Sequence, residues 1–450
     1  MRGMYTSLVA NIFFPLHERL KQHTTVKVKK SMEQSQWMTI EQIKQLQLVR
    51  LQSLLSYADK NVPYYKQLFK KQDFDVEIQS LDDLKKLPFL TKREIRENLE
   101  NLKSSGATDL MCFNTGGSSG EPLVFFIGNE RVSHDVAAKW RATRWWDVDI
   151  GDTEVVVWGS PIELGSQDRV RAMRDKLLRT ILLPAFEMSK EKLDMFITQI
   201  QNFKPSMLFG YPSALAHIAK HARAKGIAMN DLGIKVAFVT SERLYDEQRE
   251  NIESVFGCKV ANGYGGRDAG FIAHECPEGG MHITAEDIIV EIVDQAGEVL
   301  PFGQVGEIVI THLATKDFPF IRYRTGDIAV LDEKNCKCGR GLPLIKEIQG
   351  RSTDFIIAAD GTVMHGLSLI YVIRDIQGVE NFKITQESIC LTRVELVVSS
   401  GFSETNVAVI RNGISQRLGE DVKVDVELVE NIASEVSGKF RYVISHVVSS

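Results

Sequence analysis

The stretch SMLFGYPSALAHIAKHARAKG, residues 206–226, places a short apolar run directly before a longer amphipathic pattern. The run at 206–210 predicts a buried strand, and the segment that follows it predicts a helix. The same alternation continues on both sides, with strands expected at 153–158 and 235–240 and helices at 189–203 and 245–256. Strands that alternate with helices are typical of a layered α/β sheet.

The flanking regions differ from this central part. Residues 1 to about 105 are expected to form a helical leader, because Leu48, Leu51, Leu55 and Ala58 share one helical face. Thr91 and Glu94 form the pattern of a capping box that opens a further helix. After residue 270 the pattern becomes β-rich, and the last hundred residues fit a small α+β module. We therefore predict an α/β fold with a large layered domain over 1–350, including a β-rich subdomain, and a small mobile domain over 351–450.

Composition limits the class of function. The chain has 450 residues, 25% of them charged, and a net charge of −5 with dispersed basic residues, which argues against a nucleic-acid partner.

An apolar stretch near the amino terminus is interrupted by Asn11 and followed by Pro15 and is too short to span a bilayer, so we expect no transmembrane segment and no signal peptide. A core helix is the favoured interpretation of this stretch, with weak peripheral membrane contact as the alternative. Six cysteines are few for this length and favour a reducing, cytoplasmic location.

A glycine-serine loop, NTGGSSGEP at 114–122, has the composition of an anion-binding turn. Its glycines let the backbone amides turn inward, and its hydroxyl groups add further donors. Surface loops share this composition, so the loop alone is weak evidence for phosphate binding. Glu121 also stands where such loops usually carry a cation.

A second pattern predicts a metal site. Cys276 and His282 lie in CPEGGMH, and Cys336 and Cys338 lie in CKCG. Three cysteines and a histidine form a ligand set that Zn²⁺ takes in closed structural sites. His274 competes with His282 as the imidazole ligand, and three unconnected buried thiols are the alternative to a metal.

Five further motifs follow in order along the chain: SERL at 241–244, NGYGGRDAG at 262–270, YRTGD at 323–327, GRSTD at 350–354 and SGKFR at 437–441. With these motifs the chain resembles the adenylate-forming superfamily, in the branch of phenylacetate–CoA ligase and relatives named for capsular polysaccharide biosynthesis. The resemblance covers nearly the whole chain. It implies an enzyme that uses ATP to convert a carboxylate to an acyl-adenylate, releases pyrophosphate, and transfers the acyl group to a thiol or an amine.

The resemblance also implies roles for single residues. Lys439 would be catalytic and bridge the carboxylate and the α-phosphate, Asp268 would hold Mg²⁺, Asp327 would hold the ribose hydroxyls, and Arg351 would assist it. The implied ATP-binding residues are Thr115, Gly116, Gly117, Ser118, Ser119, Gly120, Ser241, Glu242, Gly263, Tyr264, Gly265, Asp327 and Arg351. The implied substrate pocket contains Trp158, Tyr211 and Asn262.

A reaction of this kind requires positive charge in the active site. A carboxylate and a phosphate are both anionic, so the site must supply positive charge to the transition state. Lys439 and Mg²⁺ would supply it, and Arg141 or Arg144 would add more near the loop. The expected cofactors are ATP, Mg²⁺, structural Zn²⁺ and, if the acceptor is a thiol, CoA.

Two other functions stay open at this point. One is an amide-forming ligase that acts on a uronic or amino acid during polysaccharide assembly. The other is a catalytically silent zinc protein that binds nucleotide. The identity of the acid, the choice between a thiol and an amine, and the oligomeric state are not determined by the sequence.

Overall fold

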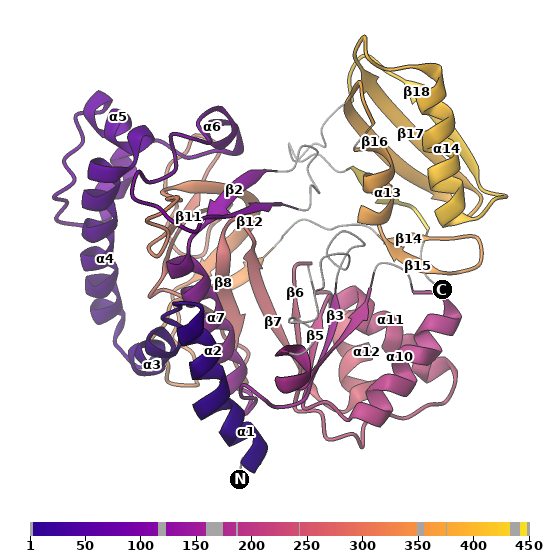
Figure 1. The fold of residues 1–450 in the computed structure, drawn as a ribbon, viewed down its shortest axis with the longest axis horizontal. Helices are drawn as coiled ribbons and strands as arrows, with labels where there is room; N and C mark the ends of the chain where they lie inside the picture. The colour runs from indigo at the N-terminus through magenta and orange to yellow at the C-terminus, as the bar shows by residue number, and fades with distance from the viewer. Residues whose placement is uncertain are drawn as a thin grey trace.

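The computed structural model describes residues 3–115, 123–158, 174–185, 188–242, 244–348, 355–374, 376–432 and 442–447. Within these residues an eleven-stranded sheet runs through the large domain, and a separate four-stranded sheet forms the carboxy-terminal domain. Figure 1 shows the carboxy-terminal domain in yellow at one corner of the molecule and the amino-terminal helices in indigo along the opposite side. The predicted combination of a layered α/β domain and a small α+β domain is confirmed.

Helices form the leader. Its elements are α1 (Met4–Leu8), η1 (Val9–Phe13), α2 (Phe14–Leu20), α3 (Thr25–Ser35), α4 (Ile40–Asn61), α5 (Pro63–Lys71), η2 (Leu81–Lys86) and α6 (Lys92–Glu97). The predicted capping box at the start of α6 is confirmed, because Thr91 and Glu94 exchange side-chain and backbone hydrogen bonds. The predicted inner face of α4 is also confirmed, with Leu51, Leu55 and Ala58 fully buried.

The central part of the sheet is parallel. It contains β3 (Glu154–Trp158), β4 (Thr180–Pro184), β5 (Met207–Gly210), β6 (Val236–Thr240) and β7 (Lys259–Gly266), in the order β4-β3-β5-β6-β7. The helices of this part are α7 (Asn129–Arg144), α10 (Lys190–Phe203), α11 (Pro212–Ala224) and α12 (Asp246–Phe256). Successive strand side chains point to opposite faces. Leu208 therefore packs in the core under α10–α12, while Met207 packs in a different cluster with Ala142 of α7.

The rest of the large sheet is antiparallel and joins the parallel part at β7. Its strands are β8 (Gly270–Glu275), β9 (Met281–Ile283), β10 (Ile288–Val293), β11 (Val305–His312), β12 (Tyr323–Asp332) and β13 (Leu344–Ile348), in the order β7-β8-β9-β13-β12-β11-β10. A two-stranded hairpin, β1 (Met111–Asn114) and β2 (Val124–Ile127), lies beside it. One core cluster contains residues of α4, this hairpin and β8–β12, so the leader packs on the antiparallel part.

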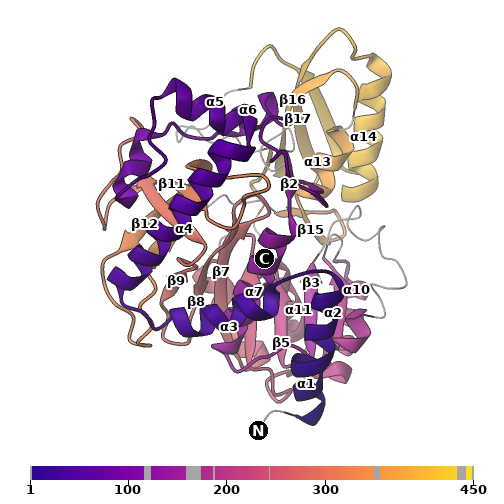
Figure 2. The same ribbon diagram turned by 60° about the vertical axis from the view of Figure 1, so that its left-hand side comes forward.

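The carboxy-terminal domain has its own core. It contains β14 (Phe355–Ile357), β15 (Val363–His365), α13 (Leu367–Ile373), β16 (Val379–Ser388), β17 (Leu391–Val398), α14 (Glu404–Leu418), β18 (Lys423–Leu428) and β19 (Val443–Ser445). Ile410, Ile414 and Leu418 of α14 are fully buried against the four-stranded sheet. Figure 2 shows this domain clear of α1 and α2 in a second view. None of the helices in the described ranges is long and apolar enough to cross a membrane.

Candidate active site and metal centre

The carboxyl ends of the parallel strands bring several predicted residues to one edge of the sheet. Trp158 is the last residue of β3, Tyr211 follows β5, and Ser241 follows β6. Parallel strands end at the same edge, and ligands of open α/β sheets bind there. The rings of Trp158 and Tyr211 are stacked, with centroids 4.4 Å apart and planes at 19°. Two of the three residues predicted for the substrate pocket thus form one half-buried aromatic wall.

The turn after β6 is fixed by a polar contact. Ser213, in the first turn of α11, donates a hydrogen bond to the carboxylate of Glu242. Ser241 has a φ of 74°, a left-handed conformation that non-glycine residues seldom adopt. Strained residues of this kind cluster at functional sites. The contact links the segments that follow two neighbouring strands, β5 and β6.

The predicted residues Asn262, Gly263, Tyr264 and Gly265 lie on β7, where it pairs with β8. The register shifts by a bulge between Tyr264 and Gly265. A Cβ atom on Gly265 would lie 2.2 Å from the carbonyl oxygen of Gly270, so no other residue fits there without moving the partner strand. The bulge bends the carboxyl end of β7.

Two tyrosine–aspartate pairs join this hairpin to β12. The Tyr264 hydroxyl donates to Asp327 Oδ2 at 2.9 Å, and the Tyr323 hydroxyl donates to Asp268 Oδ2 at 2.6 Å. Asp268 Oδ1 also accepts from the backbone N–H of Ala269 at 3.1 Å. Both predicted carboxylates are therefore held in fixed positions. The sequence analysis missed Tyr323, although it begins the YRTGD motif.

Arg131 is a second residue that the sequence analysis missed. It lies on α7, is 2% exposed, and forms an ion pair with Asp135 at 2.8 Å. Its two terminal nitrogens donate to the backbone oxygens of Arg267 and Asp268 at 3.3 and 3.4 Å. This side chain holds the turn that carries Asp268. No local pattern marks this role, because Arg267 and Asp268 are more than a hundred residues away from Arg131.

The glycine-serine loop begins and ends in the β1–β2 hairpin. Asn114 pairs with Val124, and Thr115 forms two hydrogen bonds with Leu123, each 3.0 Å long. The rest of the loop, Gly116 to Pro122 with Glu121, lies outside the described residues. Arg351 and Lys439 also lie outside them.

The expectation for Arg141 and Arg144 is wrong. Arg141 is fully buried and pairs with Glu286 at 2.6 Å. Arg144 pairs with Asp149 at 2.7 Å and with Glu33. Both guanidinium groups form ion pairs between α7 and its neighbours, so nearby carboxylates already compensate their charges.

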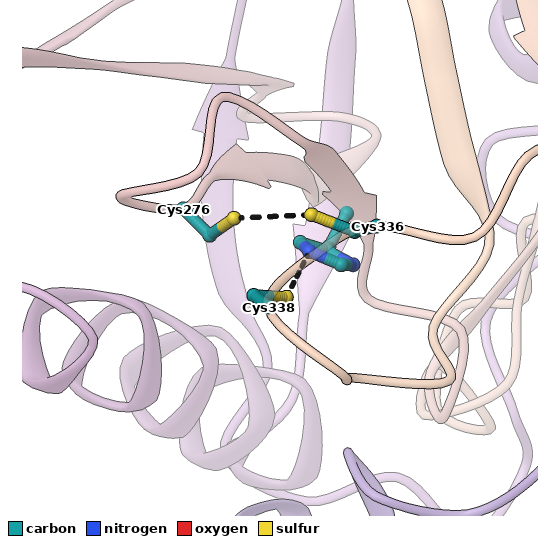
Figure 3. Close-up of side chains that lie close together, drawn as sticks. Cys276, Cys336 and Cys338 are labelled. Carbon is teal, nitrogen blue, oxygen red and sulfur yellow. Dashed lines mark hydrogen bonds between the residues drawn. The ribbon is translucent and has the colours of Figure 1, made fainter.

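The four predicted metal ligands come together at the other end of the β8–β9 hairpin. The Sγ atoms of Cys276 and Cys336 are 3.6 Å apart, and Cys338 Sγ lies 3.2 Å from His282 Nε2. All four ligand atoms lie within 4.8 Å of one another. Figure 3 shows the three thiols directed at one point from two segments of the chain, and each is a free cysteine. The alternative of unconnected thiols is therefore wrong.

The surroundings of this Cys-His cluster suit a metal ion. His282 Nδ1 lies 3.3 Å from the Leu342 carbonyl oxygen, a contact that directs Nε2 toward the thiols. Burial lowers the pKa of His282 to about 4, so the imidazole is neutral and able to ligate. A Cβ on Gly280 would come within 2.6 Å of Cys336 Sγ, so glycine leaves room for the cluster. His274 is not one of the four and instead stacks on Phe271 at 5.4 Å.

Comparison with known proteins agrees with this geometry. Residues 178–314 match the family described as AMP-binding enzyme, and residues 356–446 match the CapK C-terminal domain. Crystal structures of 2-hydroxyisobutyryl-CoA ligase share the fold. The structure in complex with 2-HIB-AMP and CoA, in the thioesterification state, has a TM-score of 0.65 and is 24% identical in sequence. The alignment covers 91% of this chain and 90% of that chain. The AMP-binding family match and the shared fold support an adenylate-forming ligase.

Two curated relatives specify the branch. Protein CapK of Staphylococcus aureus is 25% identical over 414 residues, which cover 90% of this chain and 89% of that protein. Phenylacetate-coenzyme A ligase of Thermus thermophilus is 27% identical over 327 residues, which cover 70% and 72% of the two chains. The two family matches and these relatives together support an adenylate-forming protein of the CapK and phenylacetate–CoA ligase branch.

Proposed function

We propose that the protein activates a small or aryl carboxylic acid with ATP and transfers the acyl group to CoA. A carboxylate oxygen attacks the α-phosphorus of ATP, and the bond to the bridging oxygen breaks, so that acyl-adenylate and pyrophosphate form. The acceptor sulfur then attacks the acyl carbon, loses its proton, and displaces AMP. The observation that carries the proposal is the gathering of the aromatic wall and the two tyrosine–aspartate pairs where β3, β5, β6 and β7 end.

Nucleotide binding is assigned to the hairpin and β12. Asp327 would accept hydrogen bonds from both ribose hydroxyls, since one carboxylate can accept two at once. Asp268 would hold Mg²⁺, which supplies positive charge at the phosphates. Because both oxygens of Asp268 already accept hydrogen bonds, from Tyr323 and from the Ala269 backbone, the geometry favours contact through a water molecule.

Phosphate and acyl transfer are assigned to the glycine-serine loop, to Lys439 and to the carboxy-terminal domain. The loop 115–120 would surround the departing pyrophosphate with amides and hydroxyls. Lys439 would neutralise the carboxylate and the α-phosphate during attack. Residues 351–450 would act as a lid that swings about a hinge at 350–354, so that Lys439 leaves before the acceptor arrives. The separate core of this domain supports that movement.

The stacked aromatic rings at the ends of β3 and β5 support a flat, apolar acid. Trp158 stacks on Tyr211 and also lies 5.9 Å from the ring of Phe209. Aromatic faces of this kind bind planar groups by stacking. Asn262, within β7, would supply a polar contact to the acid.

An amide-forming ligase is the second candidate. The CapK relative covers 90% of this chain, whereas the phenylacetate-coenzyme A ligase of Thermus thermophilus covers 70%. The carboxy-terminal domain is matched by the CapK C-terminal family. If this domain helps to admit the acceptor, these matches favour an amine, such as one met in polysaccharide assembly.

The Cys-His cluster would hold a structural Zn²⁺. Three thiolates and one imidazole match a closed tetrahedral site. The ion would join the β8–β9 hairpin to the segment before β13, and it would stabilise the antiparallel part of the sheet without taking part in the reaction. Its thiols require a reducing compartment, and on that ground we place the enzyme in the cytoplasm.

The experiment measures pyrophosphate release from ATP with aryl, fatty, uronic and amino acids, each without acceptor, with CoA, and with amines. We expect one acid class to stimulate release and CoA to increase turnover. Stimulation by an amine in place of CoA would select the amide-forming function. No release with any acid, from folded protein that binds ATP, would contradict both.

A further inference from the structure

The elements α1, η1 and α2 follow one another without a break and form one continuous helix from Met4 to Leu20. The residues that join α1, η1 and α2, namely Val9 and Phe14, have right-handed helical backbone angles. One face of the element packs on the large domain, with Val9, Ala10 and Phe14 buried against Trp140 and Ile150. Thr6 Oγ1 also donates to Asp152 at 2.8 Å. This element, which we call the amino-terminal helix, is a fixed part of the fold.

Its outer face is apolar. Met4, Leu8, Ile12, Leu16 and Leu20 are 92%, 39%, 55%, 54% and 77% exposed. They recur at every fourth residue, and four residues of an α-helix turn about 40° beyond one full rotation. The π-helical turn of η1 has more residues per turn and offsets part of this drift. The five side chains therefore form one stripe along the helix, about 24 Å long at 1.5 Å per residue.

The segment that contains the amino-terminal helix is basic, whereas the whole chain has a net charge of −5. Residues 1–30 contain six Lys and Arg residues, of which Lys29 is buried, and a single acidic residue, Glu18, whereas the whole chain has 54 basic and 59 acidic residues. Glu18 is 4% exposed and accepts a hydrogen bond from Thr25, so it adds no acidic group to the surface. Arg19 and Lys21 are exposed beside the end of the stripe.

We propose that this face docks on a bilayer that contains anionic phospholipid. The helix would lie in the plane of the membrane surface, with the stripe among the acyl chains and Arg19 and Lys21 at the phosphates. Apolar residues on one face and basic residues beside them are the features of helices that bind in this manner. A second copy docked through the same face would bring two basic segments together, so charge favours the anionic surface.

Docking of this kind is compatible with the movement of the carboxy-terminal domain. In Figures 1 and 2 the amino-terminal helix lies at the bottom of the molecule and the carboxy-terminal domain at the top. A membrane at the helix would leave that domain in water. The proposal concerns location only, and it stands whether the acceptor is a thiol or an amine.

The test is co-sedimentation of the full chain with phosphatidylcholine vesicles, with and without phosphatidylglycerol. We expect binding that requires phosphatidylglycerol and weakens as salt is raised. The variant Ile12→Asp/Leu16→Asp is expected to lose binding at least about tenfold, because it places two charges in the apolar stripe. Val49→Asp is the matched control, since Val49 is 53% exposed on α4 and should leave binding unchanged.

A second variant, Arg19→Glu/Lys21→Glu, leaves the stripe intact and should weaken binding to phosphatidylglycerol vesicles. All variants should melt at the wild-type temperature and release pyrophosphate at the wild-type rate in solution. Absence of wild-type binding, or equal binding by Ile12→Asp/Leu16→Asp, would overturn the proposal. A wild-type dimer that this variant dissociates, measured by light scattering, would assign the stripe to a second copy and would also overturn it.

Discussion

At the scale of single residues, the two tyrosine–aspartate pairs explain how the carboxylates of the site are held. Tyr323 and Asp268 are 55 residues apart in the sequence, and Tyr264 and Asp327 are 63 apart. The sequence identified both aspartates and Tyr264 through motifs. It did not identify the role of Tyr323, because a hydrogen bond between distant strands leaves no local pattern.

Tyr323→Phe tests this positioning. The variant keeps the buried ring, which also packs on Phe320 at 5.2 Å, and removes the hydrogen bond to Asp268. A hydrogen bond to a charged group contributes about 1.5–3 kcal/mol. We expect the KM for MgATP to rise about tenfold or more, with little change in melting temperature. Tyr65→Phe is the control, since Tyr65 donates to the Pro319 carbonyl within the core, and an equal KM effect in both variants would contradict the role.

Cys336→Ser tests the Cys-His cluster. Elemental analysis of the purified wild-type protein should give about one zinc per chain, and the variant should give almost none. The variant should also melt at a lower temperature. Cys258→Ser, at a buried thiol outside the cluster, should keep the zinc. A wild-type protein free of metal, with an unchanged melting temperature after Cys336→Ser, would refute the structural zinc.

At the scale of elements, the local sequence pattern predicted where helices and strands lie, but it did not predict which strands pair in the sheet. The helix α10 (Lys190–Phe203) lies within the predicted helix at 189–203, and β6 lies within the predicted strand at 235–240. The union of parallel and antiparallel strands into one sheet was not predictable, because strand order depends on contacts between distant segments. The π-helical turn of η1 also has no sequence signal.

Gly265→Ala tests the bulge that turns β7. The new methyl group would lie 2.2 Å from the Gly270 carbonyl oxygen, so β7 and β8 must separate. Overpacking of this kind costs about 1–3 kcal/mol of unfolding free energy. We expect that loss in urea unfolding, together with weaker ATP binding. Gly106→Ala is the control, since its Cβ would meet only the Tyr57 hydroxyl at 3.8 Å; equal losses in the two variants would contradict the tight bulge.

At the scale of the whole molecule, buried histidines couple stability to pH. Burial lowers the pKa of His274 to about 3 and those of His217 and His312 to about 4, from 6.5. Below pH 6.5 the unfolded chain therefore binds protons that the folded chain does not. The free energy of unfolding should fall as the pH drops from 6.5 toward 4, by up to about 2 kcal/mol per histidine by pH 5.

The variant His274→Phe measures how much one histidine contributes to the pH dependence of the free energy of unfolding. Its ring lies between Phe271 at 5.4 Å and Phe238 at 5.7 Å, so a phenyl ring suits the surroundings. Urea unfolding at several pH values between 7 and 5 should show a smaller loss of stability in the variant. The same loss in both proteins would show that His274 does not cause the pH dependence.

The sequence also predicted the fold class, an α/β sheet domain with a small α+β domain, because local periodicity distinguishes strands from helices. Lys439 and Arg351 rest on the family motifs alone, because they lie outside the described residues. Arg141 and Arg144 were assigned to the wrong role, since their ion pairs involve residues of other elements that the sequence does not place nearby.

The central claim is that an acyl-adenylate is formed and then transferred, and isotope transfer tests it most directly. The acid that stimulates pyrophosphate release is labelled with oxygen-18 in its carboxylate, and the products are analysed by mass spectrometry after complete turnover. We predict AMP that carries one labelled oxygen and unlabelled pyrophosphate, and no labelled AMP from Lys439→Ala protein that still binds ATP. Unlabelled AMP, or label in inorganic phosphate, would contradict the claim.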